Sequence, residues 1–253
     1  MEKVKDPTKN NGNSTILIVS IVLIIAVVLG GFYFFLNKQA EEREVWDMTM
    51  SAPDDLTVEY VEDDTLGHYV SFRTVEEPDH VIDIFEDPSC PFCSDFAQAH
   101  GETLNDKLAS GELELNAHMM NFLDENSGMT YSDDASGIII ELAKNGDAVN
   151  AWRVYNEIWE NQPGTGTALD QVPTMDDMIS ALKSSDVTVD ESVIQELEDD
   201  SQKGQRAQKS NVTNTDSLIE TTNRVSTPTV FFDNDQQQFE IGDNEYLEGL
   251  FEN

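Results

Sequence analysis

Cysteine is almost absent from this chain: Cys90 and Cys93 are the only two in 253 residues. A framework of several disulfides is therefore excluded. The four histidines show no paired spacing, and a four-ligand zinc site usually needs a second pair of Cys or His residues. The sequence also contains no D-x-D-x-D-G loop that would bind calcium. We therefore expect no metal ion and no other cofactor.

Basic residues are also scarce, because 14 Lys and Arg face 50 Asp and Glu, which gives a net charge of −36 at pH 7. The excess of carboxylates lies after residue 37. Such a field repels nucleic acid and anionic lipid, so neither is an expected partner. We interpret the acidity as a source of solubility in a setting where salt screens the self-repulsion.

Charged residues are missing altogether from a run that extends from Ile16 to Leu36. As a helix this run would be about 32 Å long, which is enough to cross the hydrocarbon core of a bilayer. A cleaved signal peptide has a shorter core and a small-residue exit site, whereas here Gly30-Gly31 leads into aromatic residues. We therefore predict an uncleaved transmembrane anchor over residues 15–37.

The anchor divides the chain into a short tail and a large domain. Residues 1–14 carry three lysines, and the tendency of basic flanks to stay inside predicts that this tail is cytoplasmic. Residues 38–55 form an acidic juxtamembrane linker, and residues 56–253 form the folded domain. The prediction is a single-pass protein of the cell membrane, with its domain on the extracytoplasmic side, where disulfides persist.

The two cysteines stand where a buried strand meets a helix. Residues 81–85 are apolar and rich in β-branched side chains, which predicts a strand, and Ser89 is the predicted N-cap of the helix that follows. Cys90-Pro91-Phe92-Cys93 opens this helix, with the proline in its first turn. A thiol at a helix start lies among unpaired N–H groups near the positive end of the dipole, and both favour the thiolate. Cys93 is one turn deeper, within reach of Cys90 for a disulfide.

A lone CxxC motif has two other interpretations, a static local disulfide and half of a metal site. A bridge that closes so short a loop would contribute little chain-entropy stabilisation to a domain of this size. The placement of the motif between a strand and a helix therefore favours redox chemistry over both.

The elements around the motif predict an α/β fold. The strand 81–85, a helix from Cys90 to Gly111 and a strand at 112–120 form a βαβ unit, which implies parallel pairing. The other predicted elements are strands at 56–61 and 69–72, helices at 132–144, 148–160, 176–183, 190–209, 216–224 and 245–251, and a hairpin of 225–233 with 238–241 around a turn at Asn234-Asp235.

Residues from about 131 to 210 form a helical insertion between the two halves of the α/β domain. Within it, Val149, Trp152, Tyr155 and Trp159 recur at helical spacing. A stripe of this kind is more often core than cofactor site, so we assign it to the core.

A second segment of interest is Thr227-Pro228-Thr229, which leads into the last strands. Proline cannot occupy a paired central position of a sheet, so Pro228 marks an edge or a tight turn. Because cis bonds are a small minority of X–Pro bonds, the sequence alone predicts a trans bond here.

CPFC at a helix start, a helical insertion and the late Thr-Pro-Thr segment resemble, in this order, the DsbA-type branch of the thioredoxin superfamily. The membrane-anchored forms of Gram-positive bacteria are the most similar. The resemblance covers about Leu56 to the C-terminus and implies a thioredoxin-like fold. It also implies these site roles: Cys90 as nucleophile, Cys93 as resolving thiol, Pro228 in cis beside the disulfide, Thr227 against the substrate, and Pro91 and Phe92 as residues that tune the redox potential.

The sequence departs from the family at one position. Many members carry a buried acid six residues before the first cysteine, where it accepts the proton of the resolving thiol, but this chain has Ile84 there. Asp83 points to the opposite face of an alternating strand and cannot simply substitute for it. Water or Glu86, near the strand end, could take the proton, so the role stays unassigned at this point.

The resemblance implies a membrane-tethered thiol–disulfide oxidoreductase that introduces disulfides into exported proteins with free thiols. A membrane-embedded or quinone-linked partner would reoxidise it. One alternative is a disulfide reductase or isomerase of the same fold, although residues 38–55 are too short for the dimerisation domain that isomerases typically add. Another is a non-catalytic thioredoxin-like binding module, which poor solvent access to Cys90 would favour.

Overall fold

The computed structural model of the protein describes residues 51–163, 167, 169–185, 188–199, 205–238, 243 and 245–251. The predicted tail, the anchor at 15–37 and most of the linker at 38–55 lie outside the described residues. Within the described part, no helix is both long enough and apolar enough to cross a membrane.

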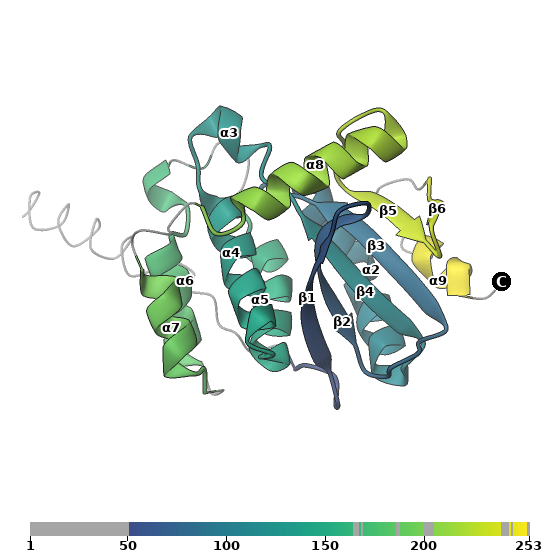
Figure 1. The fold of residues 1–253 in the computed structure, drawn as a ribbon, viewed down its shortest axis with the longest axis horizontal. Coiled ribbons are helices and arrows are strands. Elements are labelled where there is room, and N and C mark those ends of the chain that lie inside the picture. Colours follow the sequence, from purple (N-terminus) through teal and green to yellow (C-terminus); the bar gives the residue numbers. More distant parts are fainter. Residues whose placement is uncertain are drawn as a thin grey trace, which may run out of the picture. The chain divides into compact units, whose positions relative to one another are not determined.

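A sheet with the strand order β1-β2-β4-β3-β5-β6 forms the centre of the described chain (Figure 1). The hairpin predicted at its start is confirmed, because β1 (Thr57–Asp63) and β2 (Gly67–Arg73) are antiparallel. β3 (His80–Glu86) and β4 (Leu113–Met119) are parallel, as expected of a βαβ unit. β2 joins β4, and β5 (Thr229–Phe232) joins β3 and β6 (Asp235–Gln236), all in antiparallel pairs.

The helix between β3 and β4 is α2 (Pro91–Ser110), with Pro91 in its first turn, where a missing N–H costs nothing. Gly111 ends it with a φ of 80°, a left-handed conformation that glycine adopts without a steric penalty. Its N-cap is Cys90, so the prediction that Ser89 caps the helix is wrong. The Ser89 hydroxyl instead donates to Asp124 Oδ1 at 2.6 Å.

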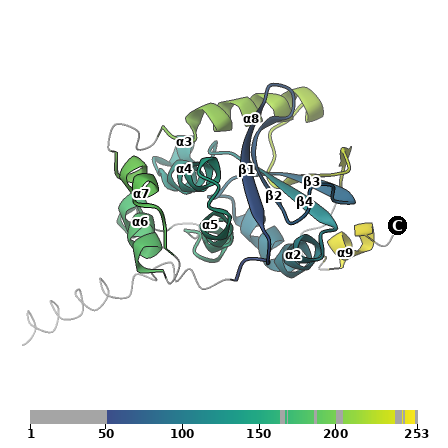
Figure 2. The same cartoon turned by 60° about the horizontal axis from the view of Figure 1, so that its bottom comes forward.

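Helices cover both faces of the sheet (Figure 2). α2 and α9 (Tyr246–Phe251) lie on one face, and α8 (Gln208–Thr222) crosses the other. The alternation of β3 explains this arrangement, because Ile82 and Ile84 enter the core with α2, whereas Phe85 joins a cluster with Leu218 of α8.

The helical insertion that the sequence predicts is present, and it packs on the β1 side of the sheet. α4 (Tyr131–Lys144) and α5 (Ala148–Glu160) contact each other and β1, while α6 (Met175–Ser184) and α7 (Glu191–Glu198) pack on α4. Two short elements, α3 (Asp124–Ser127) and a 3-10 turn at Leu169–Gln171, were not predicted.

The aromatic stripe of α5 belongs to the core, as predicted, with one exception. Trp152, Tyr155 and Trp159 are buried, and the Phe72 ring packs edge-on against Trp152 at 5.3 Å between centroids. Val149 is 37% exposed, so its assignment to the core is wrong. It lies in the first turn of the helix, near the end of the stripe.

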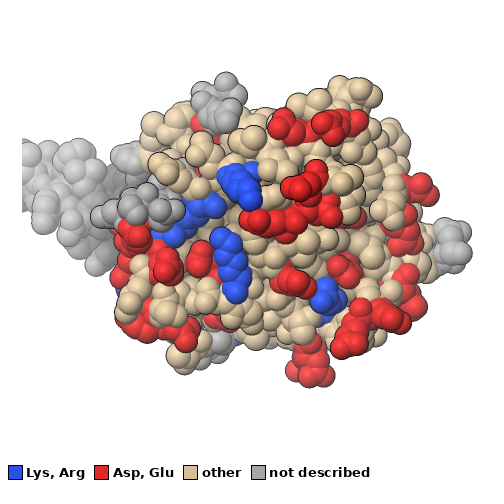
Figure 3. Space-filling view, viewed as in Figure 1, with Lys and Arg blue, Asp and Glu red and all other residues tan. Residues whose placement is uncertain are grey.

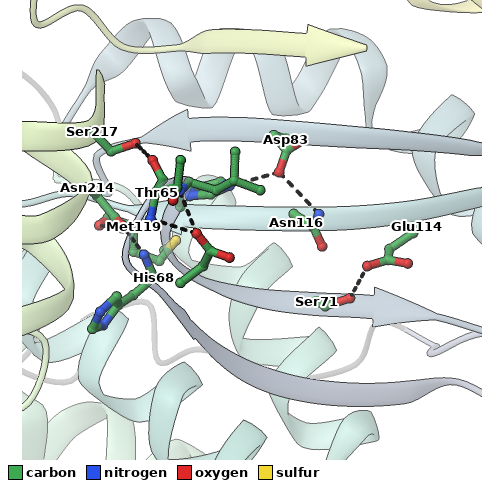
Figure 4. A network of polar contacts seen from close by, with 12 residues as sticks. Thr65, His68, Ser71, Asp83, Glu114, Asn116, Met119, Asn214 and Ser217 are labelled. Carbon is green, nitrogen blue, oxygen red and sulfur yellow. Dashed lines mark hydrogen bonds and ion pairs between the residues drawn. The ribbon is translucent and has the colours of Figure 1, made fainter. Parts of the chain in front are cut away.

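The boundary between the last two long helices differs from the prediction of helices at 190–209 and 216–224. α7 ends at Glu198, and α8 already begins at Gln208. The buried face of α8 is polar: Asn214 accepts from the His68 amide at 2.6 Å and donates to the Met119 carbonyl at 2.8 Å (Figure 4). A helix that docks through amide hydrogen bonds has little apolar periodicity. The hydrophobic pattern of the sequence therefore did not reveal the first two turns of α8.

The final hairpin is tighter than predicted. Its turn residues are Asp233 and Asn234, both with positive φ, one residue earlier than the predicted Asn234-Asp235. β5 pairs with β6 directly after the turn. Residues 239–241 lie outside the described residues.

Candidate active site

The structure brings the two predicted site segments together. The Cys90 thiol donates to the Thr227 carbonyl at 3.5 Å, although the two residues are far apart in sequence. The Thr227–Pro228 bond is cis, so the prediction of a trans bond from the sequence alone is wrong and the form implied by the family resemblance is present. The trans preference of an X–Pro bond is small, and tertiary context can reverse it. Pro91 and Phe92 are exposed beside the buried pair, Phe92 by 54%.

Cys90 is the thiol that ionises easily. Its pKa is lowered from 9.0 to about 6, chiefly because the Cys93 thiol is hydrogen-bonded to its sulfur. Burial opposes this shift, and the Thr227 side chain and the backbone N–H groups of Cys93 and Phe92 support it. The helix start therefore contributes as the sequence predicts, but the neighbouring thiol contributes more.

Cys93 has the opposite character. It is fully buried on the first turn of α2, and burial raises its pKa well above 9.0. The nearby sulfur of Cys90 and the carboxyl of Glu86 raise it further. Both cysteines are free thiols in this structure. The site thus pairs a thiolate at neutral pH with a thiol that holds its proton.

Glu86, whose role the sequence left open, lies beside Cys93. It follows Ile84 on the same face of β3, whereas Asp83 is on the other face and bonds to His118 at 2.9 Å and Asn116 at 3.1 Å (Figure 4). Glu86 is 1% exposed and hydrogen-bonded to Tyr155, and burial raises its pKa to about 8. It therefore carries a proton at neutral pH next to the resolving thiol. The alternation of side chains along the strand would have been enough to place Glu86 on the face of Ile84.

Asp87 fixes the loop that leads from β3 into α2. It is fully buried, and its carboxylate accepts from the Ser132 hydroxyl at 2.6 Å and from the amides of Ser89 at 2.9 Å and Leu123 at 3.0 Å. Burial raises its pKa to about 7. The start of α4 thereby holds the segment that carries Cys90.

Gln162, just after α5, holds the same segment from the other side. Its side-chain nitrogen donates to the carbonyls of Pro88 and Cys90, both at 2.7 Å. A second contact ties α5 to α2, because the Ser94 hydroxyl donates to the Trp159 carbonyl at 2.8 Å. Sequence reasoning missed Gln162, since nothing in its local pattern marks it.

The surface near the sheet is acidic. Figure 3 shows acidic side chains spread over this face and only a few basic ones. One of the ion pairs of the described residues joins Lys209 to Glu62 at 3.1 Å. Among the residues that the structure describes, no group of three or more His, Cys, Asp or Glu side chains is arranged to hold a metal ion.

One thiol with a lowered pKa and one with a raised pKa lie at the start of a helix and face a cis-proline loop. This arrangement defines a thioredoxin-type redox site. A family model described as thioredoxin matches residues 75–249, so the chain belongs to the thioredoxin family. Within the superfamily its architecture is of the DsbA type, with the helical insertion between the two site segments.

Three solved structures illustrate this likeness. The thiol-disulfide oxidoreductase MdbA of Corynebacterium diphtheriae is 20% identical with a TM-score of 0.65, over 81% of this chain and 98% of that one. Oxidised BdbD of Bacillus subtilis is 17% identical with a TM-score of 0.54, over 79% and 97%. Reduced DsbA of Mycobacterium tuberculosis is 20% identical with a TM-score of 0.52, over 76% and 92%. No curated protein matches the sequence.

Proposed function

We propose that the protein is a thiol–disulfide oxidoreductase that introduces disulfides into exported proteins through Cys90 and Cys93. The observation that carries this proposal is the opposite pKa shift of the two thiols, to about 6 for Cys90 and well above 9.0 for Cys93. A merely structural buried cysteine is inert and has a raised pKa, whereas a lowered pKa marks a reactive one. The likeness to the corynebacterial MdbA, a thiol-disulfide oxidoreductase, supports the same conclusion.

The reaction begins with the Cys90–Cys93 disulfide. A substrate thiolate attacks Cys90 Sγ, a mixed disulfide forms, and Cys93 leaves as a thiolate that takes up a proton. A second substrate thiolate then attacks the substrate sulfur of the mixed disulfide and expels Cys90. Cys90 leaves readily because its pKa is low. The substrate loses two electrons, and the enzyme is left as the dithiol.

Glu86 supplies the proton to Cys93 in this scheme. Its carboxyl is protonated at neutral pH, because burial raises its pKa to about 8, and it lies close enough to Cys93 to raise the pKa of that thiol. In the reverse direction, when the dithiol is reoxidised, the Glu86 carboxylate takes the proton back. Glu86 thus fills the role that the family usually gives to the position of Ile84.

We further propose that residues 15–37 tether the protein to the cell membrane with the domain outside the cytoplasm. The uncharged run of the sequence supports this, together with the net acidity of the domain. A membrane-embedded or quinone-linked partner would then accept the electrons of the dithiol.

One observation favours the alternative of a non-catalytic module. Cys90 is only 5% exposed, so a bulky substrate would reach little more than the sulfur itself. The lowered pKa of Cys90 and the exposure of Phe92 beside it favour catalysis.

The test is a single turnover of the oxidised, full-length protein in detergent with a peptide that carries two thiols. One peptide disulfide should form per enzyme disulfide consumed. Cys93→Ala should accumulate a mixed disulfide at Cys90, and Cys90→Ala should accumulate none. Equilibration with glutathione then gives the redox potential, which decides whether the protein reduces or oxidises its substrates. A redox potential of about −270 mV would indicate a reductase, and one of about −120 mV an oxidase. If neither turnover nor a mixed disulfide is observed, the alternative of a non-catalytic binding module is favoured.

A further inference from the structure

The proton that moves between Glu86 and Cys93 must be exchanged with solvent, yet both side chains are closed off from it. Glu86 is 1% exposed and Cys93 fully buried. Among the described residues, Glu86 Oε1 has no hydrogen-bond partner. The titratable groups that face this carboxyl from the packed elements are Cys93 of α2 and Tyr155 of α5. Neither opens directly to the surface.

A groove of about 440 Å³ lies between α2 and α5, and neither Glu86 nor Cys90 lines it. A smaller, more enclosed cavity of about 20 Å³ shares Ala97, Gly101, Asn156 and Trp159 with the groove and also touches Glu86. The four shared residues place the cavity next to the groove, on the side of Glu86.

The small cavity is large enough for one water, and polar groups belong to some of the residues that line it. A cavity needs roughly 10–15 Å³ of this measure to hold one water, and the water needs at least two polar partners. Glu86 Oε1 is one such partner. Trp152, which also lines the cavity, has an indole N–H without a hydrogen-bond partner in the described part of the chain. Tyr155 also lines the cavity.

Gly101 is the residue that keeps the groove open. It lies inside α2, where glycine is the poorest helix former after proline. Its backbone does not require glycine, because Gly101 is not among the positive-φ residues of the described chain. Crowding does not require it either, since a Cβ at this position would meet nothing within 4 Å. A side chain here would instead project into the open space of the groove, beside the cavity.

We propose that the proton exchanged between Cys93 and Glu86 travels through a water in this cavity to the groove between α2 and α5, apart from the surface that receives the substrate. Of the described residues that line the groove, none belongs to the substrate surface of Cys90, Phe92, Thr227 and Pro228. Two exposed residues, Glu102 and Glu160, are among those that line the groove, so the groove reaches the surface. The inference rests on the proposed function and adds the route.

The proton balance is as follows in the direction of substrate oxidation. Cys93 leaves as a thiolate, the Glu86 carboxyl gives it a proton, and the resulting carboxylate takes one from the cavity water, which is replenished from the groove. In reoxidation each transfer runs backward, so Cys93 is deprotonated by the Glu86 carboxylate. Substrate and proton can therefore enter or leave the site at the same time.

The test follows the two thiols separately in the reduced, full-length protein. An aromatic disulfide reagent releases one coloured thiolate when Cys90 attacks it and a second when Cys93 displaces the aromatic group from Cys90. The first phase reports Cys90, and the second reports deprotonation of Cys93 by Glu86. We compare Gly101→Leu, which fills the floor of the groove, with Ala109→Leu, which adds the same side chain to an exposed position of α2.

Gly101→Leu should leave the first phase unchanged and shift the pH midpoint of the second upward by about one unit, which is about tenfold in rate at pH 7. Ala109→Leu should behave as the wild type. Glu86→Gln should slow the second phase. Gly101→Leu should have no further effect in that background, because the carboxyl that the leucine would separate from the groove is already gone. Asn156→Leu narrows the groove from α5 and replaces Gly101→Leu if that variant does not fold.

An unchanged second phase in Gly101→Leu and Asn156→Leu would overturn the route. So would an equal slowing in the Glu86→Gln background, since the leucine would then act by distorting α2. Either result leaves the redox function intact. If the wild type itself shows no second phase, the proposed function fails instead.

Discussion

The lowered pKa of Cys90 makes the stability of the reduced protein depend on pH in a way that the oxidised protein cannot share. With a folded pKa of about 6 and an ordinary value of 9.0, the thiolate contributes nothing at pH 5. Its contribution grows to about 1.4 kcal/mol at pH 7 and about 2.7 kcal/mol at pH 8, by proton linkage. Since the folded pKa is the lower one, this stability is full above the ordinary pKa and is lost as pH falls through about 6.

The measurement is the melting temperature of the oxidised and the reduced full-length protein at pH 5, 6, 7 and 8. Each kcal/mol shifts the melting temperature of a domain of this size by about 2–4 °C, so the reduced form should gain about 5–10 °C on the oxidised form between pH 5 and pH 8. For an oxidase, the reduced form should melt above the oxidised form at pH 7. Cys93 does not interfere in this range, because its pKa lies well above 9.0.

Three buried carboxyls also titrate in this range, namely Glu86, Asp87 and Asp133, with pKa values raised to about 8, 7 and 6. They are present in both redox forms, so their effects cancel in the difference. Glu86 is the exception because it faces Cys93, and a Glu86→Gln background removes it. A gap between the two forms that stays flat from pH 5 to pH 8 would refute the assignment of Cys90 as a stabilised thiolate.

Three further outcomes are expected. At pH 6, iodoacetamide should alkylate Cys90 before Cys93 in the reduced protein, and equal rates would indicate a static pair. Gln162→Leu should raise the pKa of Cys90 and destabilise the fold by about 1–2 kcal/mol, because the carbonyls of Pro88 and Cys90 lose their shared donor, as thiolate absorbance and melting would show. Protease added to intact spheroplasts should remove the domain, and full protection until lysis would reverse the proposed orientation.

The parts of the fold that the sequence predicted well are those whose signal is local. The apolar strand before Cys90, the proline in the first turn of α2 and the alternating strand after Gly111 each follow from neighbouring residues. The redox pair could be predicted for the same reason, because its chemistry depends on a helix start that the motif itself creates.

The parts that the sequence did not predict depend on contacts between distant segments. The largest cause of the low pKa of Cys90 is the orientation of the Cys93 thiol, which spacing alone does not determine. Gln162 reaches Cys90 across more than seventy positions of sequence. The first half of α8 is held by Asn214, whose two hydrogen bonds to β2 and β4 replace an apolar stripe. In each case the role of the side chain depends on the group that it contacts in the folded structure, and not on the residues next to it in the sequence.

The helical insertion is therefore part of the site and not an addition to it. α5 supplies Tyr155, which holds Glu86, and is followed by Gln162, which holds the Cys90 carbonyl. α4 supplies Ser132, which binds Asp87 in the loop before α2. Without these helices Cys93 and Glu86 would face water, burial would no longer raise either pKa, and the contrast between the two thiols would shrink. The insertion creates the dry environment on which that contrast depends.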